Sequence, residues 1–119
     1  MDIIKIKENS LVHSYKGGLK TSFCYDLVAI ECDKPFIRLI FKDEKVLVRV
    51  SLITIETQLQ NCFIRISRRV IINMHHVIKF FFRNGSYWIC IKQDSRFIEY
   101  KVSQRREKVV RSAYLLFAN

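Results

Sequence analysis

The sequence has very little glycine or proline and no long apolar run. Of its 119 residues, three are Gly and one is Pro, while half are hydrophobic. This composition excludes low-complexity and intrinsically disordered chains, which have low hydrophobicity. Charged residues at Asp2, Lys5 and Lys7 interrupt the N-terminal apolar residues, and no apolar stretch reaches the roughly 18 residues that span a bilayer. The sequence therefore predicts no signal peptide and no transmembrane helix, and so no membrane partner in the sense of a bilayer that the chain spans.

The cysteines lack the close spacing of metal or redox sites. Cys24, Cys32, Cys62 and Cys90 stand far apart, and no C-x-x-C pair occurs. A chain of this length buries enough surface to fold as one domain without disulfides or metal ions. We therefore expect buried thiols, a reducing cytoplasmic compartment and no cofactor.

Residues suited to catalysis are also scarce. The second half of the chain, residues 61–119, contains only three acidic residues, and the chain has no glycine-rich phosphate loop. His75 and His76 are adjacent, and neighbouring residues of a strand point to opposite faces, so they form a poor metal-binding pair. We expect one of them at a turn or edge between two strands, and we predict a protein that is not an enzyme.

Positive charge is abundant and unevenly distributed. The formal net charge is +10. Residues 1–60 carry nine basic and eight acidic residues, whereas residues 61–119 carry twelve basic and three acidic residues. This segregation predicts a face that binds a polyanion, either a phosphate backbone or an anionic lipid surface.

Most of the chain shows the pattern of β-strands. Apolar, β-branched and aromatic runs alternate with turn-forming residues, and Asn84-Gly85 is suited to the positive φ angles of a type I′ hairpin turn. The two strands around this turn and the strand after Asp94 form a predicted three-stranded meander. Strands are predicted at 3–7, 27–30, 36–41, 46–50, 63–66, 70–72, 77–82, 87–92 and 97–102, with a turn over 31–35.

Two segments have helical spacing. Ser51 stands at an N-cap position before apolar residues three and four apart, which predicts a short helix near 52–60. Ser103 is the predicted cap of a helix near 104–117. Basic residues crowd the start of this second helix, where they oppose the helix dipole, so a bound phosphate is one explanation and a solvated helix face the other. The predicted apolar face of the second helix comprises Val109, Val110, Ala113, Leu116 and Phe117.

Arginine-rich segments occur where charge is costly unless it projects from a loop. Arg68 and Arg69 interrupt one β-rich stretch, and Arg105 and Arg106 follow another. Arginine reads guanine in the major groove through a bidentate contact and holds phosphate with its planar fork. Two such loops on a β scaffold could read bases, although from these residues alone RNA and acidic lipid remain open.

Six segments, in order along the chain, match the signature of a known family. The sequence FIRISRRVIIN at 63–73 matches F-x-R-x-H-R-S-Y-L-V-N. The other matches are DLVAIE at 26–31, SLITIETQL at 51–59, HVI at 76–78, NG at 84–85 and VSQR at 102–105. Over roughly residues 26–111 the chain thereby resembles the LytTR-type DNA-binding domain.

The resemblance implies a mostly β fold with elongated antiparallel sheets and short helices, whose loops enter the major groove. It implies sequence-specific binding of double-stranded DNA for transcription regulation, usually as the C-terminal module of a bacterial two-component response regulator. We expect residues 1–119 to form a single domain of this type without a receiver domain, either acting alone or excised from a longer protein. Binding to tandem half-sites is usual for the family and leaves a homodimer open.

Carried over by position, the resemblance assigns DNA contacts to three loops. Arg68 and Arg69 fall in the base-reading loop, Arg105 falls in a second one, and Lys34 falls in a third one around 34–37. Lys108 matches a position beside the DNA backbone. Ser67 replaces the family's His, Val70 its Tyr and Gln104 an Arg, so the target sequence need not resemble that of any relative. The implied DNA-binding residues are Lys34, Ser67, Arg68, Arg69, Ser103, Arg105, Arg106 and Lys108.

Two other classes of non-catalytic β module compete with this interpretation. A protein-interaction domain would bind a partner through apolar edge residues and show little retention on DNA. An RNA-binding domain would need exposed aromatic side chains on a sheet face, and Tyr87, Trp88 and Tyr100 are the candidates.

Overall fold

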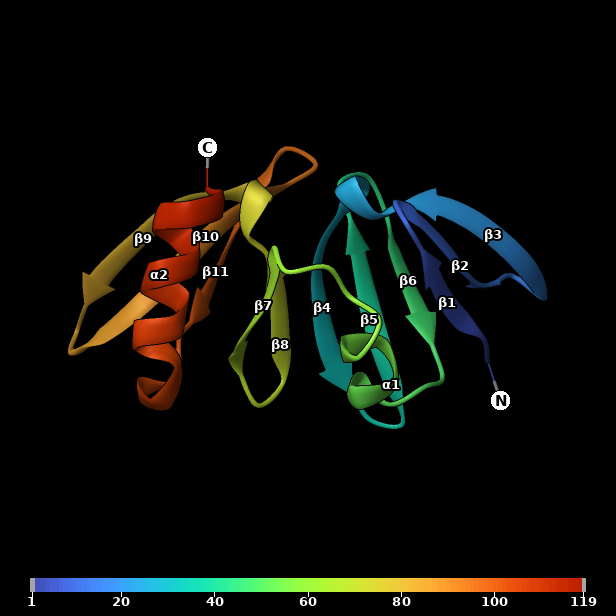
Figure 1. Ribbon diagram of the computed structural model, residues 1–119, viewed down its shortest axis with the longest axis horizontal. Coiled ribbons are helices and arrows are strands. Elements are labelled where there is room, and N and C mark those ends of the chain that lie inside the picture. The colour runs from blue at the N-terminus through green and yellow to red at the C-terminus, as the bar shows by residue number, and fades with distance from the viewer. Residues whose placement is uncertain (1, 119) are drawn as a thin grey trace.

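A computed structural model describes residues 2–118 of the chain as an elongated domain of 43 × 26 × 25 Å. Three antiparallel sheets follow one another along the long axis, with the five-stranded sheet between two three-stranded ones (Figure 1). The predicted mostly β fold with elongated antiparallel sheets is confirmed.

The strands pair mainly with their neighbours in sequence. The N-terminal sheet has the order β1-β2-β3, the central sheet β6-β5-β4-β8-β7, and the C-terminal sheet β11-β10-β9, which is the predicted meander. The bounds are β1 Ile4–Lys7, β2 Ser10–Tyr15, β3 Gly18–Phe23, β4 Leu27–Asp33, β5 Phe36–Phe41, β6 Lys45–Val48, β7 Phe63–Ser67, β8 Val70–Asn73, β9 Val77–Arg83, β10 Ser86–Gln93 and β11 Arg96–Lys101.

The central sheet is buried on both faces, which explains its nearly continuous apolar runs. Leu39 points into a core shared with the N-terminal sheet, and its neighbour Ile40 points into a core shared with the C-terminal sheet. Ile55 completes the first core, while Ile89 and Val110 belong to the second. Two hydrophobic cores thus hold the three sheets together.

Most of the predicted turns lie where the sequence places them. Asn84 and Gly85 adopt φ angles of 52° and 80°, as the predicted type I′ turn requires. His75 and His76 lie in a 3₁₀ turn, Met74–His76, between β8 and β9, which confirms their expected place. The turn predicted over 31–35 is shorter, because β4 continues to Asp33.

The first predicted helix is present but shorter than expected. Helix α1 spans Leu52–Glu56, and the Ser51 hydroxyl accepts a hydrogen bond from the Thr54 amide at 3.2 Å. The helix does not reach residue 60, because the Gln58 amide donates to the carbonyl of Ile55 at 2.9 Å and the Leu59 amide to that of Glu56 at 3.3 Å, three residues back instead of four.

The second predicted helix begins with a 3₁₀ turn, Gln104–Arg106, and continues as α2, Glu107–Phe117. Ser103 makes no side-chain capping hydrogen bond, so its predicted cap role is wrong. Val110 and Ala113 are buried as predicted, whereas Val109 and Leu116 are 43% and 74% exposed. The helix buries only a narrow stripe because it lies along one end of the elongated domain (Figure 1).

Three of the four cysteines are buried, and Cys32 is only half-buried. Burial raises the pKa of the Cys24 and Cys62 thiols, which disfavours the reactive thiolate. Within residues 2–118, no three His, Cys, Asp or Glu side chains are grouped to hold a metal ion. Over the same residues, no helix is long and apolar enough to cross a bilayer.

Candidate nucleic-acid interface

Three turns that carry predicted DNA-binding residues lie on one long edge of the domain. They are the β4–β5 turn, the β7–β8 turn and the start of α2, all at the lower edge of Figure 1. Lys34 lies in the first turn, Arg68 and Arg69 form the second, and Arg105 lies in the third. Residues far apart in sequence therefore project from the same side of the protein.

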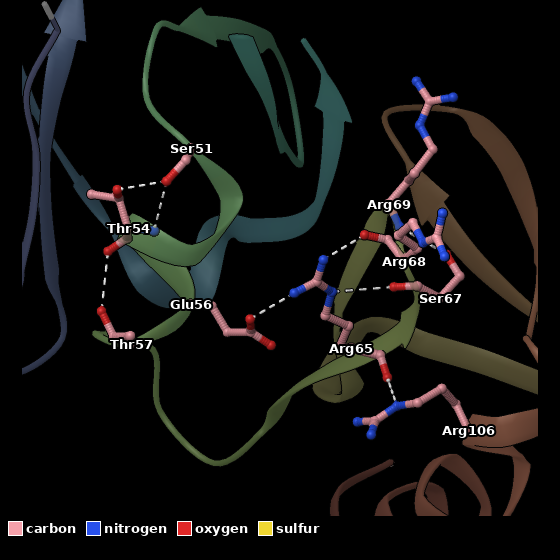
Figure 2. Close-up of polar contacts among 9 residues, drawn as sticks. All are labelled: Ser51, Thr54, Glu56, Thr57, Arg65, Ser67, Arg68, Arg69 and Arg106. Carbon is pink, nitrogen blue, oxygen red and sulfur yellow. Dashed lines mark hydrogen bonds and ion pairs between the residues drawn. The ribbon is translucent and has the colours of Figure 1, made fainter. Parts of the chain in front are cut away.

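Arg65 of β7 holds the β7–β8 turn in shape. Its Nε donates to the carbonyl of Ser67 at 3.3 Å, and its Nη2 donates to the carbonyl of Arg68 (Figure 2). Its Nη1 donates to Oε1 of Glu56 on α1 at 2.8 Å. One planar guanidinium thus ties the turn to the helix, a geometry that lysine cannot reproduce.

The start of α2 is attached to the same strand. The Ser103 amide donates to the carbonyl of Ile66 at 2.9 Å, and Arg106 Nε donates to the carbonyl of Arg65 at 2.8 Å. The Ser103 carbonyl in turn accepts from the Arg106 amide at 2.9 Å, which closes the 3₁₀ turn. These bonds hold the second arginine-bearing loop against the first.

The β4–β5 turn is connected to the β7–β8 turn from the other side. The Cys32 amide donates to the carbonyl of Arg69 at 2.7 Å, and Arg69 Nη2 donates to the carbonyl of Cys32 at 3.0 Å. Lys34 follows two residues later in an exposed turn before Pro35. All three turns are therefore linked by backbone hydrogen bonds.

Three of the acidic side chains near this edge are paired with arginines. Arg38 pairs with Glu31 at 2.9 Å and with Asp33 at 2.6 Å, and Arg65 pairs with Glu56. The hydrogen bond to Glu31 raises the pKa of Arg38. These carboxylates therefore contribute little negative field where a polyanion would approach.

The remaining cations at the edge are available to a ligand. Lys34, Arg68, Arg105 and Lys108 are exposed, and within the described residues their side chains form no hydrogen bond or ion pair. Arg106 is half-buried, and its Nε is committed to the carbonyl of Arg65. The edge thus presents a net positive surface on a rigid frame.

The structure brings five of the eight predicted residues around one open hollow between the two arginine-bearing loops. Arg69 lies on the far side of its turn, toward Cys32, while Lys34 and Lys108 lie outside the hollow. The five are Ser67, Arg68, Ser103, Arg105 and Arg106, and the hollow is also lined by Glu56 and Arg65.

Glu56 and Arg65 were not among the predicted site residues. Arg65 is the arginine of the F-x-R pattern, so a signal was present in the sequence. Its role depends on a contact with α1 nine residues earlier, which no pattern in β7 alone reveals.

Comparison with known proteins gives a consistent result. A family model of the LytTr DNA-binding domain matches residues 20–114. The fold is similar to a solved LytTr DNA-binding domain of a Bacillus cereus protein described as a methyl-accepting/DNA response regulator. The match has a TM-score of 0.75 and 16% sequence identity, and it covers 90% of this chain and 97% of the other. Among curated proteins, none matches the chain.

Proposed function

Because the chain belongs to the LytTr DNA-binding domain family, we propose that it binds specific sequences of duplex DNA and thereby regulates transcription. The observation that carries this proposal is the pair of arginine-bearing loops fixed side by side by Arg65. A preorganised pair of loops loses little conformational entropy on binding, which favours discrimination between base sequences.

In this proposal, the β7–β8 turn and the segment 103–106 enter the major groove. Arg68 and Arg105 are exposed and form no ion pair within residues 2–118, so they are the side chains assigned to base edges. Arginine makes the commonest specific contact of this kind, a bidentate bond to guanine. Ser67 and Ser103 line the hollow between the loops, where their hydroxyls can bond a base or a phosphate.

The remaining predicted residues contact the phosphate backbone. Lys34 lies in the β4–β5 turn and Lys108 in the first turn of α2, and these elements flank the β7–β8 turn (Figure 1). Arg69 and Arg106 each retain guanidinium nitrogens beyond those used within the protein. Backbone contacts fix the register of a protein on the duplex and carry no sequence information directly. These four residues therefore set affinity and orientation.

The proposal extends to the setting in which the domain acts. Residues 1–119 function as a single DNA-binding domain without a catalytic step, in the bacterial cytoplasm and within a two-component system. Two copies occupy tandem half-sites, either as a homodimer or independently. Support for this setting comes from the family's usual role and from the free thiols at all four cysteines.

The direct test is selection of bound duplexes from a random pool at moderate salt, followed by sequencing. The proposal predicts enrichment of a motif of a few base pairs, repeated once per helical turn when two copies bind. Arg105→Ala in the same selection is predicted to relax one base position of the motif. A pool that stays flat with the unmodified protein overturns the proposal and leaves only electrostatic binding.

A further inference from the structure

The C-terminal sheet has two faces of different character. At every second position the residues of this sheet face α2. The Phe80 ring lies near that of Tyr114, with centroids 5.7 Å apart, and Arg111 Nη2 donates to the Tyr87 hydroxyl at 2.6 Å. The residues between them point away from α2 and form the outer face of the sheet. Its principal members are Lys79, Phe81, Arg83, Trp88, Phe97 and Lys101.

Aromatic and basic side chains lie next to one another on the outer face. Trp88 on the middle strand is paired with Phe81 of β9 on one side and with Lys101 of β11 on the other. Next along the sheet, Lys92 is paired with Phe97, which is 65% exposed. Exposed phenylalanine beside lysine has no evident role in folding, because it contributes to neither hydrophobic core.

Cations on this face already contact aromatic rings. The Arg83 guanidinium lies 4.5 Å from the ring centroid of Trp88 and 5.3 Å from that of Phe81, and Lys79 Nζ lies 4.6 Å from Phe81. The carboxylate on the face, Glu99, is paired with Arg83 at 2.9 Å. The outer face is therefore a positively charged surface with flat π-systems between the charges.

We propose that the outer face binds single-stranded nucleic acid, with unpaired bases stacked on Trp88 and Phe97 and phosphates at Lys92 and Lys101. A single strand alternates a flat base with an anionic phosphate, which matches this surface in both chemistry and charge. The bases of a duplex are already stacked and unavailable to such rings, and an acidic peptide would leave the exposed Phe97 without a stacking partner.

The position of Lys101 supports a nucleic acid over other anions. Lys101 ends β11 and lines a second hollow together with Ser67 and Ser103, two residues of the proposed duplex-binding edge. Lys101 thus lies at the margin of the outer face that is nearest to that edge. The proposal stands independently of whether the edge reads a duplex sequence, because its contacts involve other side chains.

Trp88 provides the test, since it is the only tryptophan in the chain. The full chain is titrated at low salt with oligothymidylate, oligouridylate, a blunt duplex and a heparin fragment while Trp88 emission is measured. The proposal predicts quenching and saturable binding with the single strands, weaker quenching with the duplex, and none with heparin. The affinities for oligothymidylate and oligouridylate show whether DNA or RNA is preferred, because only RNA carries a 2′-hydroxyl.

Variants separate stacking from charge, with binding followed by anisotropy of a labelled strand. Phe97→Ala is predicted to weaken single-strand binding by roughly five-fold or more, the usual effect of losing one stacked base. Its exposure means that folding is preserved, which circular dichroism checks. Phe23→Ala removes a similarly exposed phenylalanine from β3 of the N-terminal sheet, so it is the matched control and is predicted to leave single-strand affinity unchanged.

Three results overturn the proposal. One is unchanged single-strand affinity in Phe97→Ala combined with Lys101→Ala. Another is equal affinity for heparin and for oligothymidylate, which shows that charge alone binds the strand. The third is a clear preference for phosphatidylglycerol vesicles over either single strand, which assigns the outer face to a lipid surface.

Discussion

Nη1 of Arg65 donates to Oε1 of Glu56 at 2.8 Å and thereby connects α1 to the proposed DNA-binding edge. The same guanidinium binds the carbonyls of Ser67 and Arg68, while the Arg65 carbonyl accepts from Arg106. Because α1 is anchored in a hydrophobic core through Ile55, this contact transmits the rigidity of the core to two surface loops.

Arg65→Lys is predicted to loosen the β7–β8 turn without unfolding the protein. Lysine keeps the charge but cannot reach Glu56 and two carbonyls at once, so the free energy of unfolding falls by about 1–2 kcal/mol. Hydrogen exchange at the Arg69 amide is predicted to accelerate. Glu56→Gln is the milder control, with a loss below about 1 kcal/mol because the ion pair is partly exposed. Unchanged exchange in Arg65→Lys would contradict the positioning role.

Arg105→Ala and Lys108→Ala are predicted to impair DNA binding in different ways. Losing a base contact at Arg105 removes about 1–3 kcal/mol of discrimination at one base position. Loss of the Lys108 side chain weakens binding to all DNA sequences alike, and it flattens the slope of log affinity against log salt concentration by roughly one. Titrations of matched and altered duplexes over a salt series measure both effects. An equal loss on every sequence in Arg105→Ala would rule out base reading by that residue.

Ser51→Ala is predicted to lower the free energy of unfolding by about 1 kcal/mol. The Ser51 hydroxyl caps α1 by accepting from the Thr54 amide, and an alanine leaves that amide without its partner. Ser112→Ala, on the exposed side of α2, is the control and should be nearly neutral. Urea denaturation compares the two variants, and equal stabilities would argue against the cap.

Tyr100→Phe is predicted to weaken the contact between the C-terminal and central sheets. The Tyr100 hydroxyl donates to Oε2 of Glu31 at 2.6 Å, and burial, together with this bond, raises the pKa of Tyr100. Removing the hydroxyl costs about 1–2 kcal/mol in the free energy of unfolding, because a carboxylate loses a charge-assisted bond. Tyr87→Phe, whose hydroxyl accepts from Arg111 at the surface, is predicted to cost less in the same thermal denaturation experiment.

Glu44→Gln is predicted to change the pH dependence of stability. The hydrogen bond from Lys20, reinforced by one from Tyr15, lowers the pKa of Glu44 in the folded protein. A lowered folded-state pKa stabilises the protein above the unfolded-state value, and this stability is lost as the pH falls through the folded-state pKa.

The unmodified protein should therefore be more stable than Glu44→Gln at neutral pH, and the difference should vanish in acid. Denaturation midpoints measured from neutral pH down to the acid pH at which Glu44 is protonated provide the check. Asp43→Asn alters an adjacent, exposed carboxylate and is the control, which should show no such convergence. A stability difference that persists in acid would exclude the Glu44 titration as its cause.

The sequence predicted the elements that have strong local signals. Asn84-Gly85 located a hairpin, and Ser51 located the start of α1, because each residue type fits one local backbone geometry. The strands β2 and β3 were not predicted, since polar residues interrupt their apolar residues and Gly18 begins the second of them. Their stability comes from pairing with each other and with β1, which local patterns do not record.

The sequence suggested side chains for the candidate site, but not the contacts that hold them in place. The family signature placed Arg68 and Arg105 in loops, and the structure brings these loops together around one hollow. The contact between Arg65 and Glu56 joins two elements through a loop, so only the folded chain brings the side chains into reach. The exposure of Val109 and Leu116 was also not predicted, because helical periodicity does not indicate how wide a part of the α2 surface the neighbouring sheet covers.

The most direct test of sequence-specific DNA binding is the affinity ratio between a selected duplex and a scrambled duplex of identical composition, measured with the unmodified protein at about 0.15 M salt. The proposed function predicts a ratio of roughly a thousand or more, the range typical of specific DNA-binding proteins. Equal affinities for the two duplexes would contradict it and reduce the positive edge to a general polyanion-binding surface.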